Sequence, residues 1–137
     1  IMSKPIPTLD KYMTPAPLTV DVSTTLAECQ RVMSEHRVRH LPVLDGAKLA
    51  GILSDRDLTL IETLQGADPR VLVAGDAMTP SPYHVSPRAS LDEVVSEMAE
   101  RKYGSAVVVD NDKVVGIFTA VDALSAFAHL LQTRLAK

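Results

Sequence analysis

The fold is decided by the stretch Gly116-Ile117-Phe118-Thr119-Ala120-Val121-Asp122, because its pattern occurs twice in the chain. The earlier copy is Gly51-Ile52-Leu53-Ser54-Asp55-Arg56-Asp57, which lies 65 residues before it. In both copies an apolar run ends at a hydroxyl residue, and a carboxylate follows three residues later. We predict that each copy is a strand leading directly into a helix. The hydroxyl and the carboxylate either cap that helix or cap it and also hold a ligand.

The same 65-residue shift matches most of the chain without a gap. Met13-Thr14-Pro15 recurs as Met78-Thr79-Pro80. Other matched pairs are Pro17 with Pro82, Val20 with Val85, Leu26 with Leu91, Met33 with Met98 and Val43 with Val108. One register kept over so long a stretch indicates an internal duplication.

We therefore expect a first repeat at residues 9–65, a linker at 66–75 and a second repeat at 76–131. The last helix is predicted to extend to about residue 136. Each repeat is predicted to fold as β-α-β-β-α, which makes the chain an α+β (α/β-like) protein. One repeat alone would bury too little surface to be stable by itself. We therefore expect the two repeats to pack sheet to sheet about a pseudo-twofold axis.

Short strands are predicted at Thr19–Val22 and Tyr83–Val85, each followed by a helix that begins at Thr25 or Ser90. Both helices begin with a hydroxyl residue and carry a glutamate three residues later, which predicts capping boxes. Hairpins follow, with turns at Asp45-Gly46 and at Asn111-Asp112. The closing helices are predicted from about Arg56 to Gln65 and from Asp122 onward. Pro42 has no N–H group to donate to a neighbouring strand. We therefore expect its strand to lie at a sheet edge, or to have no hydrogen-bonding partner on the side of the Pro42 nitrogen.

Composition excludes several classes of protein. The 137 residues are 46% hydrophobic and 23% charged, as expected of one compact globular protein. A net charge of −3 argues against nucleic-acid binding, and no apolar run is long enough for a membrane span. A single cysteine, Cys29, cannot form an internal disulfide, so we expect a cytoplasmic location. We also expect translation to start at Met2 and no secretory signal.

Catalysis is not indicated by any motif. Ser54 and Thr119 have no histidine partner in a nucleophile motif, and glycine-rich phosphate loops are missing from the sequence. Asp55 and Asp57 form a carboxylate pair in one repeat only, because Ala120 replaces Asp55 in the other. The four histidines lack metal-ligand spacing. We therefore expect no catalytic residues, no metal and no catalytic cofactor.

The duplicated motifs resemble those of the cystathionine β-synthase (CBS) domain, two of which in tandem form a Bateman module. The motifs that carry the resemblance are Met13-Thr14-Pro15, His40-Leu41-Pro42-Val43, Met78-Thr79-Pro80 and the two stretches that end at Asp57 and Asp122. The resemblance covers nearly all of the chain from Leu9 to Leu131. It implies a non-catalytic regulatory sensor of AMP, ADP, ATP or S-adenosylmethionine. It also implies a homodimer that contacts an unidentified regulated protein.

The resemblance further implies two ligand clefts, each with residues from both repeats. The favoured cleft combines Thr119, Val121 and Asp122 with Pro17, Leu18, Val38, Arg39, His40 and Pro42. The second cleft combines Ser54, Arg56 and Asp57 with Pro82, Tyr83, Tyr103, Gly104 and Ser105. In this family the aspartate takes the ribose hydroxyls, and the serine or threonine lies near the phosphates.

The two clefts are not equivalent. Arg37, Arg39 and His40 bring positive charge to the Asp122 cleft, whereas Val107 replaces the family's proline at the other. We therefore expect tighter binding of a phosphate-bearing ligand at Asp122. Tyr83 either stacks on a base or fills the second cleft, and a role in packing or at the cleft rim is also open. The alternative function is a dimerisation or interaction scaffold of the same fold with no bound nucleotide.

Overall fold

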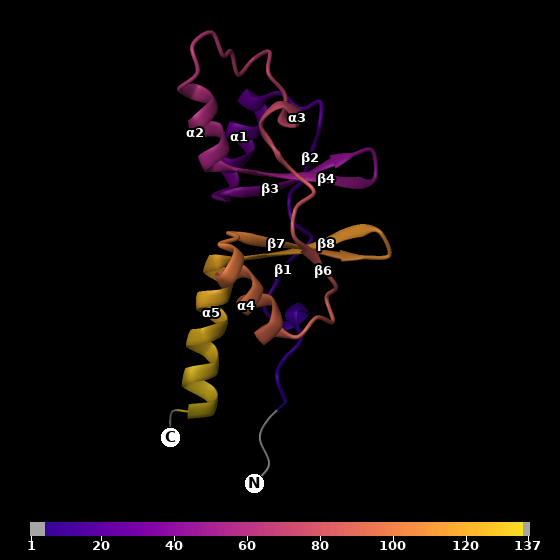
Figure 1. Ribbon diagram of the computed structural model, residues 1–137, viewed down its shortest axis with the longest axis vertical. Helices are drawn as coiled ribbons and strands as arrows, with labels where there is room; N and C mark the ends of the chain where they lie inside the picture. Colours follow the sequence, from indigo (N-terminus) through magenta and orange to yellow (C-terminus); the bar gives the residue numbers. More distant parts are fainter. Residues whose placement is uncertain (1–4, 136–137) are drawn as a thin grey trace. The chain divides into compact units, whose positions relative to one another are not determined.

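The computed structural model describes residues 5–135, which form two compact units (Figure 1). One unit is residues 17–82, and the other combines residues 5–16 with residues 83–135. Each unit contains one four-stranded sheet and its own helices. The prediction of a mixed α+β fold is confirmed.

The unit of residues 17–82 has the strand order β2-β3-β4-β5. Strand β3 runs parallel to β2 and antiparallel to β4, which in turn runs antiparallel to β5. Figure 1 shows α1 and α2 on the same side of this sheet. The elements are β2 (Val20–Asp21), α1 (Leu26–His36), β3 (His40–Asp45), β4 (Lys48–Ser54), α2 (Asp55–Glu62), α3 (Ala74–Ala77) and β5 (Thr79–Pro80).

The second unit repeats this plan with the strand order β1-β8-β7-β6. Helices α4 and α5 lie on the same side of its sheet (Figure 1). The elements are η1 (Leu9–Lys11), β1 (Thr14–Pro15), β6 (His84–Val85), α4 (Leu91–Arg101), β7 (Ser105–Asp110), β8 (Lys113–Thr119), α5 (Ala120–Leu130) and the wider helical turn η2 (Leu131–Leu135). The predicted helix end near residue 136 and the predicted start at Met2 lie outside the described residues.

The compact units do not coincide with the sequence repeats, because the two Met-Thr-Pro segments are exchanged. Thr14, from the first repeat, pairs with Ile117 at the edge of the second repeat's sheet. Thr79 pairs in the same way with Ile52 of the first repeat. A further contact holds the N-terminal segment in place, since the Tyr12 hydroxyl lies 2.6 Å from Nδ1 of His129 in α5. Sequence reasoning did not predict β1, β5 or their exchange.

Methionine packing explains why both duplicated stretches begin with glycine. A β-carbon at Gly116 would lie 2.5 Å from Sδ of Met13, which precedes β1. At Gly51 it would lie 2.5 Å from Sδ of Met78 and 2.7 Å from the carbonyl oxygen of Thr79. These distances are shorter than van der Waals contact, so a larger residue fits only if the methionine side chain moves and, at Gly51, if the backbone of Thr79 moves as well. The glycines and the Met-Thr-Pro motifs therefore form one structural feature.

Both hairpins form, but their turns differ. The predicted turn at Asn111-Asp112 is present, with φ values of 52° and 63° in the left-handed region. In the first repeat Asp45 still pairs with Lys48, so the turn residues are 46 and 47 and the prediction of Asp45-Gly46 is one residue early. Gly46, with φ of 65°, supplies the left-handed residue there.

Pro42 changes the ladder beside β2. Strand β3 lies between β2 and β4, so the prediction of an edge strand is wrong. The other alternative holds, in which the nitrogen of Pro42 faces a neighbouring strand without a hydrogen bond. In the second unit the N–H of Val107 donates to the carbonyl of Tyr83 at 2.9 Å. Pro42 stands at the matched position and has no N–H, so the carbonyl of Leu18 cannot receive that bond. Accordingly, β2 begins to pair only at Val20, which is opposite Val43.

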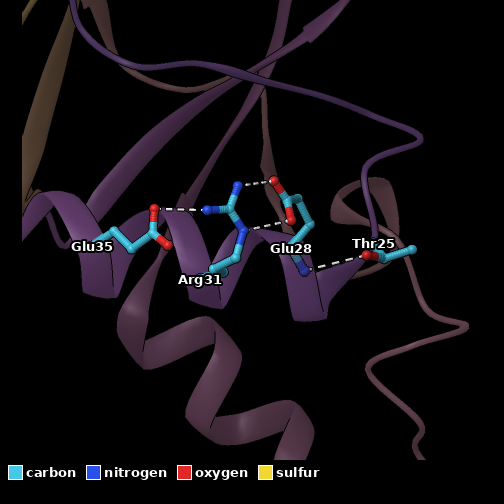
Figure 2. Close-up of polar contacts among 4 residues, drawn as sticks. All are labelled: Thr25, Glu28, Arg31 and Glu35. Atoms are coloured by element: carbon cyan, nitrogen blue, oxygen red, sulfur yellow. Dashed lines mark hydrogen bonds and ion pairs between the residues drawn. The ribbon is translucent and has the colours of Figure 1, made fainter.

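The helix caps follow the sequence in part. The hydroxyl oxygen of Thr25 accepts a hydrogen bond from the N–H of Glu28 at 3.2 Å, but the Glu28 carboxylate binds Arg31 instead of completing the capping box (Figure 2). Arg31 also donates to Glu35 at 2.7 Å, so one guanidinium links two carboxylates along α1. The capping box predicted at Ser90 is wrong, because its hydroxyl donates to Asp92 and caps no backbone group.

Each unit has its own apolar core. In residues 17–82 the fully buried core side chains include Leu26, Cys29, Leu41, Val43 and Leu53. In the other unit they include Leu9, Val94, Ala106, Val108 and Phe118. Leu9 comes from the N-terminal segment and is 0% exposed, so this segment is part of the second unit's core.

Substitution of either strand glycine tests the exchange. We expect Gly51→Ala and Gly116→Ala each to destabilise the protein by about 1–3 kcal/mol, because the added methyl group overpacks the methionine contact. The matched control is Gly75→Ala in α3, where the nearest atom to the added carbon would be 3.4 Å away. Thermal denaturation measures all three variants. A Gly116→Ala protein as stable as the control would contradict the role of the Met13 contact.

Candidate ligand-binding sites

The N-terminus of α5 carries the first candidate site. Oδ2 of Asp122 accepts a hydrogen bond from the N–H of Thr119 at 2.9 Å, and Oγ1 of Thr119 accepts one from the N–H of Asp122 at 3.3 Å. This is a complete capping box, as predicted for the capping alternative. Thr14 from β1 adds a second hydroxyl, which lies 3.3 Å from both carboxylate oxygens.

Thr14 was not among the predicted site residues. The signal for it was present, because Met-Thr-Pro is one of the duplicated motifs. Its position became clear only from the pairing of Thr14 with Ile117, two residues before the end of β8. The Asp122 carboxylate is therefore bonded by β1 as well as by the start of its own helix.

The N-terminus of α2 carries the second candidate site, with the same capping box. Oδ2 of Asp57 accepts a hydrogen bond from the N–H of Ser54 at 2.8 Å, and Ser54 Oγ accepts one from the N–H of Asp57 at 3.1 Å. Within residues 5–135 no hydrogen bond joins Asp57 to Thr79, the counterpart of Thr14. The Asp57 carboxylate therefore has fewer protein donors than that of Asp122.

Each helix start leaves one backbone donor for a ligand. The first turn of a helix has N–H groups without partners inside the helix. At α5 the N–H of Ala120 donates to the carbonyl of Gly104 at 3.1 Å, and the N–H of Asp122 is capped. The N–H of Val121 is the remaining donor, for which the described residues supply no acceptor. Such a donor at the positive end of a helix dipole favours an anion.

Arg39 and His40 lie in the same unit as Asp57. The carbonyl of Arg39 accepts a hydrogen bond from the N–H of Asp55 at 2.9 Å, and His40 pairs with Ser54 across β3 and β4. His40 is half-buried, and this burial lowers its pKa against the attraction of Asp55 and Asp57. Arg39 is exposed. His40 is thus the first residue of β3 and Arg39 precedes it, so both lie beside the N-terminus of α2.

The other predicted residues of the favoured cleft lie in the same unit. Leu18 is 39% exposed just before β2, and Pro42 is buried in β3. Pro17 and Val38 are partly buried. The grouping of these residues with Thr119, Val121 and Asp122 stays a prediction from the family resemblance.

The residues of the second predicted cleft divide in the same way. Ser54, Arg56 and Asp57 belong to residues 17–82, as does Pro82, while Tyr83, Tyr103, Gly104 and Ser105 belong to the other unit. Tyr83 and Tyr103 stack on each other, with ring centroids 5.1 Å apart and an interplanar angle of 28°. Each ring therefore covers one face of the other. Burial beside Glu97 and Tyr103 also raises the pKa of Tyr83, which keeps its hydroxyl neutral.

Residues 5–135 contain no group of three or more histidine, cysteine, aspartate or glutamate side chains arranged to hold a metal ion. None of their helices has the length and hydrophobicity required to cross a membrane.

Comparisons with known proteins agree with the duplication. The model of the CBS domain family matches residues 1–61 and 74–129. The chain is 33% identical over 99 residues to hypoxic response protein 1 of Mycobacterium tuberculosis, which covers 72% of this chain and 69% of that protein. The prediction of two such domains in tandem is confirmed.

Solved structures give the same result. The chain is similar to an acetoin utilization protein (AcuB) from Vibrio cholerae, with a TM-score of 0.85, 28% identity and coverage of 97% of this chain and 98% of that one. It is also similar to CBSX2 of Arabidopsis thaliana solved in complex with AMP, with a TM-score of 0.78, 29% identity and coverage of 90% and 97%.

The half-buried His40 predicts a pH dependence of stability. Its folded-state pKa is lowered, so the unfolded chain binds a proton at a higher pH than the folded protein does. The free energy of unfolding should therefore fall as the pH drops from neutrality through about 6.5 and then through the lower folded pKa. Urea denaturation at several pH values measures this. We expect His40→Gln to weaken the dependence, whereas the control His36→Gln, at the exposed end of α1, retains it.

Proposed function

We propose that this chain, which belongs to the CBS domain family, is a non-catalytic regulatory module that binds an adenosine-containing ligand. The candidates are AMP, ADP, ATP and S-adenosylmethionine. The observation that carries the proposal is the pair of helix starts at which an aspartate and a hydroxyl lie together with an N–H group for which the described residues supply no acceptor. A carboxylate can accept both hydroxyls of a ribose, while the N–H group and the helix dipole attract phosphate. The AMP complex of CBSX2 supports this choice of ligand.

We propose Asp122 as the ribose-binding residue of the tighter site. Thr14 and Thr119 hold its carboxylate in one orientation before a ligand arrives. A diol can replace the hydroxyl of Thr14 without changing the backbone contact to Thr119. This arrangement lowers the entropy that ligand binding must remove.

The backbone beside Pro42 supports the same site. Because Pro42 has no N–H, the carbonyl of Leu18 retains an acceptor position that Tyr83 uses internally in the second repeat. An exocyclic amino group such as that of adenine is a suitable donor for it. The stacked Tyr83 and Tyr103 leave less room for a base at the second predicted site. These two differences between the repeats support the choice of Asp122 for the tighter site.

The remaining parts of the proposal concern context. We propose that the module is a homodimer in the cytoplasm and that its output reaches a regulated protein through a ligand-dependent change of conformation. A reducing compartment agrees with Cys29, because burial raises the pKa of its thiol to about 11 and keeps it unreactive. We propose no catalytic residue and no catalytic cofactor.

A thermal-shift screen tests the ligand class. AMP, ADP, ATP, S-adenosylmethionine and NAD are each added at millimolar concentration to the purified protein. A ligand present at 100 times its dissociation constant adds about 2.7 kcal/mol to stability, which gives a clear rise in melting temperature. We expect a rise with at least one adenosine-containing compound. If none of the five stabilises the protein, the scaffold function without a bound nucleotide is favoured instead.

Calorimetric titration of the stabilising ligand tests the site. We expect Asp122→Ala to weaken binding by roughly 10- to 100-fold, because it removes a charged hydrogen-bond acceptor for the ribose. We expect Asp57→Ala to have the smaller effect. The matched control is Asp76→Ala, since Oδ2 of Asp76 caps α3 by accepting from the N–H of Val73 at 2.9 Å outside the duplicated motif. Equal losses from the first two variants, or a larger loss from Asp57→Ala, would contradict the assignment.

A further inference from the structure

The N-terminal segment is bonded to helix α5 at two points. In the last turn of the helix, Nδ1 of His129 lies 2.6 Å from the hydroxyl of Tyr12, and the centroids of the two rings are 5.6 Å apart. In the first turn, the carboxylate oxygens of Asp122 lie 3.3 Å from the hydroxyl of Thr14. These are called here the Tyr12 contact and the Thr14 contact. Both ends of one helix are thus bonded to a short segment from the start of the chain.

Of these two contacts, the Thr14 contact is the weaker. Hydrogen bonds between oxygen atoms are ordinarily about 2.5–3.0 Å long, so a hydroxyl at 3.3 Å that is shared by two oxygens is bound loosely. Among residues 5–135 the hydroxyl of Thr14 is the one hydrogen-bond donor to Oδ1 of Asp122, whereas Oδ2 also accepts from the N–H of Thr119. The direction of Oδ1 therefore depends on a contact that is sensitive to small shifts.

The first repeat contains the same threonine and aspartate without the contact between them. Thr79 and Asp57 match Thr14 and Asp122 in the 65-residue shift, and Thr79 lies in β5 as Thr14 lies in β1. No hydrogen bond joins Thr79 to Asp57 within residues 5–135. The two residue types alone therefore do not produce the contact.

Strand pairing and methionine packing do not explain this difference, because they are equal in the two repeats. Thr14 lies opposite Ile117 in its sheet, and Thr79 lies opposite the matched Ile52. A β-carbon on either strand glycine would lie 2.5 Å from the sulfur of the adjacent methionine. The cause therefore lies in residues that differ between the repeats.

The Tyr12 contact is a difference of this kind. The 65-residue shift places Ala77 at the position of Tyr12 and Leu64 at the position of His129. Neither of these side chains has a group that forms hydrogen bonds. The Tyr12 and Thr14 contacts thus occur together in the second unit, and the residues described in the first unit form neither. The Tyr12 contact is the shorter of the two, which makes it the one that holds the other in place.

We propose that Tyr12 and His129 are positioning residues for the ligand site at Asp122. Their hydrogen bond holds α5 against the N-terminal segment, so that Thr14 stays on the carboxylate and Oδ1 keeps one direction. A carboxylate has about four acceptor positions, so Oδ1 can still accept a hydrogen bond from a diol. An acceptor with a fixed direction binds a ligand at a lower entropic cost. The inference rests on the proposed ribose binding at Asp122 and adds two residues that act through Thr14.

Carbon-detected NMR of the protein without ligand tests this coupling. The resonance of the Asp122 carboxyl carbon responds to hydrogen bonds at its oxygens. We expect Tyr12→Phe, which keeps the ring, to shift this resonance in the same direction as Thr14→Val does. In a Thr14→Val background we expect no further shift from Tyr12→Phe, because residues that act through one contact are not additive. The Asp57 carboxyl carbon is the internal control and should not move. An Asp122 resonance that Tyr12→Phe leaves in place, or additive shifts in the double variant, overturn the proposal.

Variants at the other end of the Tyr12 contact separate positioning from a general effect on α5. We expect His129→Ala to reproduce the shift caused by Tyr12→Phe, and His129→Gln, which keeps an acceptor for the hydroxyl, to retain most of the wild-type resonance. The matched control is Thr133→Val, because the Thr133 hydroxyl donates to the carbonyl of His129 at 2.8 Å and does not contact the N-terminal segment. A shift from Thr133→Val as large as that from His129→Ala overturns the proposal.

Calorimetric titration with AMP extends the test to binding. We expect Tyr12→Phe to weaken AMP binding by roughly 3- to 10-fold, as the loss of one hydrogen bond does, and Thr14→Val to weaken it at least as much. The double variant should bind AMP as Thr14→Val does. AMP binding that is unchanged in Tyr12→Phe contradicts the positioning role. A wild type that does not bind AMP contradicts the proposed choice of ligand instead, and the carboxyl-carbon shifts then decide the coupling by themselves.

Discussion

The contact between a methionine and a strand glycine is the constraint on which the rest of the structure depends. Met13 lies against Gly116 and Met78 against Gly51, so each sheet accepts its edge strand from the other half of the sequence. Neither repeat forms a complete sheet without this exchange, and one unit therefore combines residues 5–16 with residues 83–135. Directly after the exchanged strands, Ala16 and Ser81 adopt φ values of 46° and 49° between two prolines. Left-handed residues other than glycine carry a conformational cost, so both repeats accept this cost at the same point of the chain.

The exchange also connects the fold with the candidate site. β1 places Thr14 beside Asp122, so the strand that completes the sheet also orients the carboxylate that we assign to ribose binding. The capping box supplies the other half of that orientation through Thr119. Capping and ligand binding are therefore compatible uses of the same groups. A change in the position of β1 and a change in the orientation of Asp122 are coupled physically, because one hydroxyl belongs to both.

The sequence predicted the features that depend on local chemistry. The hairpin at Asn111-Asp112 and the capping box at Thr119 follow from residue types that favour one backbone geometry. The exchanged strands were missed because two residues ending in proline show no periodicity, and only a partner strand makes them β. Ser90 was predicted wrongly as a cap because Asp92 offers its hydroxyl a competing acceptor. The grouping of residues from the two units could come only from the resemblance, since no local pattern encodes it.

The residues that hold each unit together are the same in both repeats, whereas residues without such structural contacts differ. Glycine, methionine and the capping carboxylate are identical in the two repeats, and each has a structural contact that forbids most substitutions. The differences fall where the described residues impose no such contact. Pro42 and Val107 leave opposite hydrogen-bonding states at the carbonyls of Leu18 and Tyr83, and neither residue disturbs its own core. Arg56 and Val121 differ in the same way on the outer helix surface. Two copies of one fold can thus keep a common framework while the side chains that each presents at its surface diverge.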